Sequence, residues 1–117
     1  MDGEEFFDRL YSQFCLHFPC YALRSPGGKG FADESASDGT RAVVLLTDGD
    51  LVERYHRARG LEKHLPVVLA DVGSLARFLR RLPAAVTHVT FDPSPRFHRR
   101  YPVDVIRDCL GLAATDV

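Results

Sequence analysis

The sequence predicts one α/β domain, built from βαβ units around a mixed, mostly parallel sheet. Three observations lead to this prediction: the length, the composition, and an alternation of short apolar runs with amphipathic segments. The chain has 117 residues, which fits a single domain of about 100–150 residues. Hydrophobic residues make up 45% and charged residues 26%, an ordinary globular composition. We therefore expect residues 1–117 to form one two-layer or three-layer sandwich.

The N-terminal segment Glu4–Phe18 is expected to form a helix. Its apolar residues recur at helical spacing, and Pro19 gives a stop signal. The residues that form this apolar face are Phe7, Leu10, Tyr11, Phe14 and Phe18. Beyond the proline, the short segment Cys20–Leu23 is expected to be a strand. The long loop that follows it would let this strand join the sheet in antiparallel orientation.

Residues 25–40 are expected to form a flexible loop. The segment reads SPGGKGFADESASDGT, and a stretch so rich in Gly, Ser and Asp buries little surface. It is also longer than most loops of compact domains. Its Gly27–Gly30 run lacks the G-x-x-x-x-G-K-[ST] spacing of a phosphate-binding loop.

The remainder of the chain alternates strand and helix patterns. The runs Ala42–Leu46 and Pro66–Ala70 are apolar at every position, typical of strands covered on both faces. The run Val86–Phe91 alternates, which favours a place nearer an edge. Helical periodicity follows each run, which predicts parallel strands. In a simple progression, right-handed crossovers would put consecutive helices on one face and leave the other to the N-terminal helix. The expected helices are Leu51–Arg59, Ser74–Leu82 and Val103–Leu112.

Charge is nearly balanced overall but unevenly distributed. The net charge of −1 indicates no strong attraction to nucleic acid or membrane. Residues 1–50 hold nine acidic and four basic residues, whereas residues 51–117 hold seven acidic and eleven basic residues. Opposite charge on the two halves would steer one copy toward another.

The cysteines and the N-terminus indicate a cytoplasmic protein with reduced thiols. Cys15, Cys20 and Cys109 are odd in number and form no C-x-x-C pair. The acidic start Met1–Glu5 is unlike a signal peptide. No apolar run approaches the ~20 residues of a membrane span, so no membrane association is expected.

Three aspartates suggest a metal site. Asp48, Asp71 and Asp92 each follow a predicted strand, and ligands of open α/β sheets bind at the carboxyl ends of the strands. If they met in space, they would offer the oxygen ligands that Mg²⁺ prefers, as in a metal-dependent enzyme of phosphoryl or phosphoester chemistry. The alternative is that they cap helices and shape turns, as Asp commonly does. Ser74 would likewise cap the helix that it begins.

No other pattern favours catalysis. The five histidines show no metal-binding spacing, and no G-x-S-x-G motif is present. We therefore assign no catalytic residue and expect no cofactor.

A loop before the last helix interleaves basic and aromatic residues. Arg and Tyr are enriched at protein interfaces, and the same mixture binds single-stranded nucleic acid by stacking and phosphate contacts. A third possibility is that the aromatic residues anchor the loop to the core while the arginines stay solvated. Because the net charge is so small, protein interaction or self-association is the favoured function. Binding of single-stranded nucleic acid is an alternative. The loop residues are Arg96, Phe97, His98, Arg99, Arg100 and Tyr101.

The order of these motifs resembles the N-terminal domain of SseB-type proteins, a family associated by name with enhanced serine sensitivity. The similarity covers roughly residues 20–93. Two positions depart from the family pattern: Asp92–Ser94 stands where Asn-Pro-Gly is usual, and Leu45–Leu46 where Pro-Val-Phe is frequent. The resemblance implies a mixed α/β domain with no established catalytic residues, which favours a non-enzymatic role. The segments that carry it are 43–48, 65–68, 75–82 and 89–93.

Overall fold

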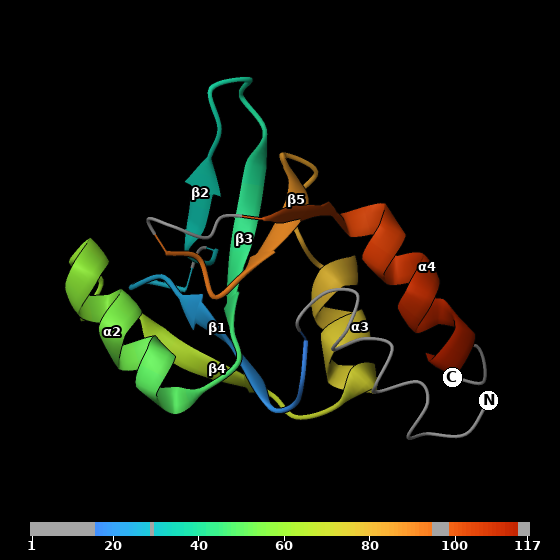
Figure 1. The fold of residues 1–117 in the computed structure, drawn as a ribbon, viewed down its shortest axis with the longest axis horizontal. Helices are drawn as coiled ribbons and strands as arrows, with labels where there is room; N and C mark the ends of the chain where they lie inside the picture. Colours follow the sequence, from blue (N-terminus) through green and yellow to red (C-terminus); the bar gives the residue numbers. More distant parts are fainter. Residues whose placement is uncertain (1–15, 29, 95–98, 115–117) are drawn as a thin grey trace.

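The computed structural model describes residues 16–28, 30–94 and 99–114, and it has one mixed sheet with helices on both faces (Figure 1). The predicted α/β class is confirmed. The strands are β1 (Cys20–Arg24), β2 (Asp33–Ser35), β3 (Arg41–Leu46), β4 (Leu65–Leu69), β5 (Val86–Phe91) and β6 (Arg100–Pro102). The helices are α2 (Gly49–Arg59), α3 (Val72–Arg80) and α4 (Val103–Ala114).

The sheet is mostly antiparallel, so the prediction of a mostly parallel sheet is wrong. The strand order is β4-β1-β3-β5-β6, and β2 pairs with β3. Along β3, Ala42 pairs with Glu34 of β2, while Leu46 pairs with Tyr21 of β1. Among the described strands, β3 and β5 form the one parallel pair. The reason is β1, which lies antiparallel between β3 and β4 and separates two strands that would otherwise pair in parallel.

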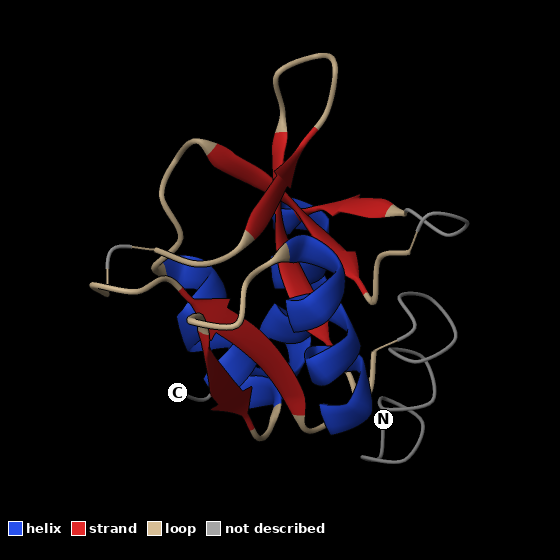
Figure 2. Cartoon of the chain, turned by 90° about the vertical axis from the view of Figure 1, so that its left-hand side faces the viewer, coloured by secondary structure: helices blue, strands red, loops and turns tan. Residues whose placement is uncertain are grey.

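The helices lie on both faces of the sheet. We expected consecutive helices on one face, as in a sheet whose strands follow one another in chain order. Because β1 is antiparallel to both β3 and β4, these two strands still run in the same direction, as does β5. However, β4 lies on one side of β3 and β5 on the other, so the two helical connections run in opposite senses. Right-handed connections of opposite sense put their helices on opposite faces. Accordingly α2 lies on one side of the sheet, and α3 and α4 lie on the other (Figure 1); Figure 2 shows the strands from the side of α2.

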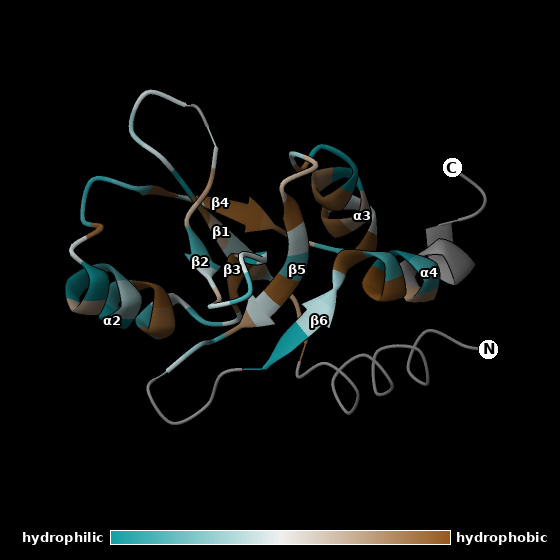
Figure 3. Cartoon of the chain, turned by 90° about the horizontal axis from the view of Figure 1, so that it is seen from above, coloured by the Kyte–Doolittle hydropathy of each residue, from teal (hydrophilic) through white to brown (hydrophobic). Residues whose placement is uncertain are grey.

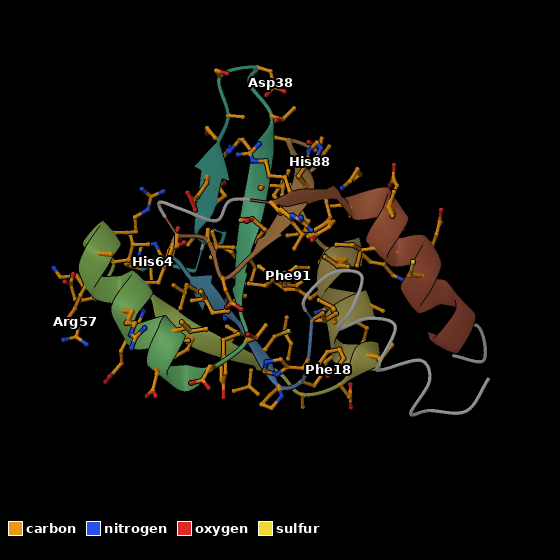
Figure 4. All side chains as sticks on the ribbon, in the orientation of Figure 1. Phe18, Asp38, Arg57, His64, His88 and Phe91 are labelled. Carbon is orange, nitrogen blue, oxygen red and sulfur yellow. The ribbon has the colours of Figure 1, made fainter. Side chains whose placement is uncertain are left out.

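Each face of the sheet carries its own hydrophobic core. Alternate residues of β3 point to opposite faces, so Val43 and Leu45 belong to the core under α3 and α4, while Val44 and Leu46 belong to the core under α2. Figure 4 shows Phe91 between the sheet and α3. The core under α2 consists of Leu23, Ala32, Val44, Leu46, Val52 and Tyr55. The core under α3 and α4 includes Leu16, Cys20, Leu69, Leu75, Phe78, Leu79, Val89, Phe91 and Ile106.

Helix α2 ends at Arg59 as predicted, but it begins at Gly49, two residues before the predicted Leu51. Asp48 precedes it in extended conformation and caps it, because the side chain accepts a hydrogen bond from the Asp50 N–H. Gly60 ends it with φ 65°, in the left-handed region where a side chain would be strained. Helix α3 begins two residues earlier than expected, because Asp71 and not Ser74 is its cap: the Ser74 N–H donates to the Asp71 carboxylate at 2.8 Å.

The segment predicted as a flexible loop, residues 25–40, contains strand β2. Its backbone also closes two turns, with the Ser25 N–H donating to the Gly30 carbonyl and the Ala36 N–H to the Thr40 carbonyl. Between β2 and β3 the chain forms a hairpin with Asp38 at its tip (Figure 4). Composition failed here because strand β2 is held by backbone pairing with β3, which polar residues make as well as apolar ones.

The predicted N-terminal helix, Glu4–Phe18, lies almost wholly outside the described residues. Its last three residues are described and are not helical. Leu16 is nevertheless only 1% exposed and belongs to the core under α3 and α4, against which Phe18 also packs (Figure 4).

Strand β4 lies at the edge of the sheet, although its uniformly apolar sequence predicted a covered strand. Leu65 is 67% exposed and Val68 57% exposed. With Val105 of α4, they are the large hydrophobic residues that the described part of the chain exposes. The strand is mostly brown in the hydropathy colouring of Figure 3. The insertion of β1 moved β4 outward, so that only its last residue, Leu69, is buried. No helix within the described ranges is long and apolar enough to cross a membrane.

The interior position of β1 leads to a testable expectation for Cys20. Burial, with a smaller contribution from the negative charge of Asp92, raises the pKa of the Cys20 thiol to about 12. The thiolate is the reactive species, so iodoacetamide at about pH 8 should leave Cys20 unmodified in the folded protein. Peptide mass mapping should show faster labelling of the half-buried Cys109 of α4. Equal labelling of the two thiols in the folded protein would contradict an interior β1, and labelling in urea provides the control.

Candidate functional site

The three aspartates of the predicted metal site do not form one cluster. Asp48, Asp71 and Asp92 follow the ends of β3, β4 and β5, as expected. However, β1 lies between β3 and β4, which separates their ends by two strand spacings, about 10 Å. Among the described residues, no three His, Cys, Asp or Glu side chains gather in a group that could hold a metal ion. Asp48 and Asp71 act instead as helix caps.

Asp92 joins the carboxyl ends of β3 and β5. Its carboxylate accepts hydrogen bonds from the Thr47 N–H at 2.8 Å and the Thr47 hydroxyl at 2.6 Å, and its own N–H donates to the Leu45 carbonyl. The backbone has φ 47°, a left-handed conformation that Asp tolerates better than most residues. The side chain therefore supports the turn that follows β5.

A small pocket adjoins this carboxyl edge. Its volume is about 230 Å³, below the usual range of small-molecule sites. It lies between α2 and the turn after β5, where strand topology predicts ligand binding. Its lining residues are Leu46, Leu51, Arg54, Tyr55, Ala58, Asp92, Pro93 and Ser94.

A buried carboxylate, Glu34 of β2, lies on the α2 side of the sheet. The residue is only 8% exposed. The Arg59 guanidinium donates to Glu34 Oε1 at 2.6 Å, and the Tyr55 hydroxyl donates to Oε2 at 3.3 Å. Burial is also the main cause that raises the pKa of Tyr55. A buried charge needs such partners, so these contacts tie α2 to the β2–β3 hairpin.

Arg100 of β6, predicted as an interaction residue, points toward the same hairpin. Its guanidinium donates to the Glu34 carbonyl at 2.5 Å and to the Thr40 hydroxyl at 2.8 Å. It also donates to the Thr40 carbonyl. The half-buried side chain thus links β6 to strand β2 and to the turn that leads into β3. This is a structural use of an arginine that we expected to be available to a partner.

The rest of the predicted interaction loop is only partly described. Arg96, Phe97 and His98 lie outside the described residues. Arg99 is exposed, while Tyr101 packs against the core, its ring 6.0 Å from that of Phe91. Binding of a partner by this loop stays a prediction.

A larger pocket, of about 450 Å³, lies at the amino ends of β3 and β5. Asp33 of β2 and Arg41 of β3 form an ion pair there, and His64 also contributes to the wall. Sequence reasoning missed both this pocket and Glu34, because all of β2 was assigned to a loop. The one signal in that loop was Phe31, whose ring packs edge-on against Phe78 at 4.8 Å.

The cap at Asp71 should make stability depend on pH. Hydrogen bonds from the Ser74 N–H and hydroxyl hold the pKa of the Asp71 carboxyl below its usual value. Because the pKa is lower in the folded state, the ionised Asp71 stabilises the fold at pH values above its unfolded-state pKa of about 4. This stabilisation is lost as the pH falls through the folded-state pKa. Asp71→Asn should therefore lower the free energy of unfolding at pH 7, with the difference shrinking at about pH 2.5. Urea titrations at both pH values measure this, with Asp108→Asn on α4 as control; a difference that is constant with pH would contradict it.

Neutralising Glu34 should cost far more stability than neutralising its neighbour. Glu34→Gln removes a buried charge bound by Arg59 and Tyr55, and we expect a loss of about 1–3 kcal/mol. Asp33→Asn breaks a more exposed ion pair with Arg41 and should cost about 0–1 kcal/mol. Urea denaturation of the two variants checks this. Equal losses would mean that the Glu34 contacts contribute little to stability.

The resemblance to SseB-type domains stays a prediction. In comparisons with known proteins, no protein-family model and no curated protein matches this chain.

Proposed function

We propose that this chain is a protein-interaction module that self-associates through the edge of β4 that pairs with no other described strand. The observation that supports the proposal is the exposure of Leu65 and Val68 on an edge strand. Edge strands offer unpaired N–H and C=O groups, and natural proteins usually protect them with charges, bulges or proline. Strand β4 contains no charged residue, and its one protective feature is Pro66.

Charge around β4 favours a second copy of the chain as the partner. Lys63 precedes the strand and Asp71 follows it. When two copies pair antiparallel, the N-terminal flank of one strand lies beside the C-terminal flank of the other, so Lys63 of each copy approaches Asp71 of its partner. The apolar residues between them meet each other without any like-charge contact.

The expected dimer is weak. Pro66 has no N–H to donate, so added hydrogen bonds concentrate on the Val68 half of a five-residue strand. Such a contact is smaller than a standard interface, and we expect a dissociation constant on the order of 10–100 μM. We also propose the cytoplasm as its compartment, which the free thiols Cys20 and Cys109 support.

The test compares two exposed valines. We expect wild-type protein to show concentration-dependent dimers in light scattering and sedimentation, up to about 0.5 mM. Val68→Lys should make it monomeric, because with Lys63 beside Asp71 of the partner the two introduced lysines would lie diagonally across the paired edges, on the same face, and repel each other. Val105→Lys changes an equally large residue, 45% exposed on α4, and should leave the dimer intact. Wild-type protein that stays monomeric, or equal effects of the two variants, would overturn the proposal.

Lys63→Glu tests the orientation of the strands. In the antiparallel dimer this substitution sets two acidic residues side by side and should weaken association, more so at low salt. An unchanged dissociation constant would contradict antiparallel pairing.

A further inference from the structure

The larger pocket is built from segments that are distant in the sequence. The β1–β2 connection, β2, β3, the α2–β4 connection and the turn before β5 all contribute to its wall. Its volume of about 450 Å³ lies within the usual range of small-molecule sites. Polar and apolar groups contribute comparably to the wall, and its apolar members are Phe31, Ala32, Val43, Leu61, Leu82, Pro83 and Val86. The apolar side chains offer a face for a flat ring, and the polar ones offer hydrogen-bond partners to a ligand that has both.

A basic and an acidic side chain, Arg41 and Asp33, lie side by side in this wall. Arg41 and Asp33 form a cross-strand ion pair, with 47% of the Arg41 side chain and 19% of the Asp33 side chain exposed. A guanidinium has five N–H donors and a carboxylate about four acceptor sites, so the pair retains hydrogen-bonding capacity for a ligand.

A third polar group in the wall, a ring nitrogen of His64, has no hydrogen-bond partner in the part of the chain that the structure describes. His64 Nδ1 is buried and has no hydrogen-bond partner among the described residues (His64 is labelled in Figure 4). Buried polar atoms are nearly always hydrogen-bonded, so this nitrogen is a candidate contact for a polar atom of a ligand.

The paired charges select against charged ligands. A carboxylate beside Arg41 would also face Asp33, and a cation beside Asp33 would face Arg41. An uncharged group that carries both a donor and an acceptor satisfies both side chains at once. From this geometry we infer that the pocket binds an uncharged aromatic or heteroaromatic molecule with an amide-type edge. The ring lies against the apolar side chains of the wall, and the amide edge meets Asp33 and Arg41.

Three molecules of nearly identical shape test this inference on the wild-type chain. 2-Naphthamide is neutral, 2-naphthoate is an anion and 2-naphthamidine is a cation. Amide shifts in ¹H–¹⁵N spectra report where each binds. We expect 2-naphthamide to shift pocket residues such as Phe31 and Val86, with a dissociation constant on the order of 1 mM. The charged analogues should bind about fivefold more weakly, as one like-charge contact implies.

Two variants then reverse the preference. In Asp33→Asn, Arg41 is left as the only charge of the pair, so 2-naphthoate should become the tightest of the three. In Arg41→Gln, Asp33 is left, and 2-naphthamidine should become the tightest. The spectra themselves show whether each variant is folded. Equal affinities of the three molecules for wild-type protein, shifts confined to other surfaces, or an unchanged order in both folded variants would overturn the inference.

Discussion

The antiparallel insertion of β1 between β3 and β4 is the constraint on which the other features of this molecule depend. It makes Cys20–Arg24 an interior strand that pairs on both sides. It also separates the end of β4 from the ends of β3 and β5, so the three aspartates that follow these strands serve local purposes. Finally, it moves β4 to the margin of the sheet, where an apolar strand is exposed. One pairing thus removes a plausible metal centre and creates a plausible protein contact.

The cost of desolvating Glu34 organises the α2 side of the sheet. A carboxylate at 8% exposure is tolerated only with charged or polar partners, and here they come from a helix more than twenty residues further along the chain. Arg100 adds a contact from β6 to the backbone of the same hairpin. Helix α2 and strand β6, from the middle and the end of the chain, are therefore both held to one short polar strand, β2.

Periodicity in the sequence was enough to predict the strands β3, β4 and β5, and the helices α2, α3 and α4, with small errors at their ends. The edges of the sheet were not predictable in the same way. The apolar pattern of Pro66–Ala70 is the same for a covered strand and for a displaced one, because periodicity does not specify neighbours. Likewise, the polar residues of β2 carry no hydrophobic signal, since backbone pairing to β3 stabilises them. The candidate sites divide in the same way, into local contacts that the sequence indicates and long-range contacts that it does not. The capping roles of Asp48 and Asp71 are local and were among the expected alternatives, whereas the Glu34 contacts and the larger pocket require long-range neighbours.

The position of β1 has a consequence for the order in which the chain folds during synthesis. Cys20 pairs with Leu69, and Tyr21 pairs with both Leu46 and Val68, so the first described strand waits for partners made much later. Contacts this distant in sequence close slowly. On the ribosome, β1 emerges before either neighbour and cannot complete its pairing until β4 has also emerged. The domain therefore assembles late in translation, around its earliest strand, and shortening the chain before Leu69 would leave β1 without one of its two neighbours.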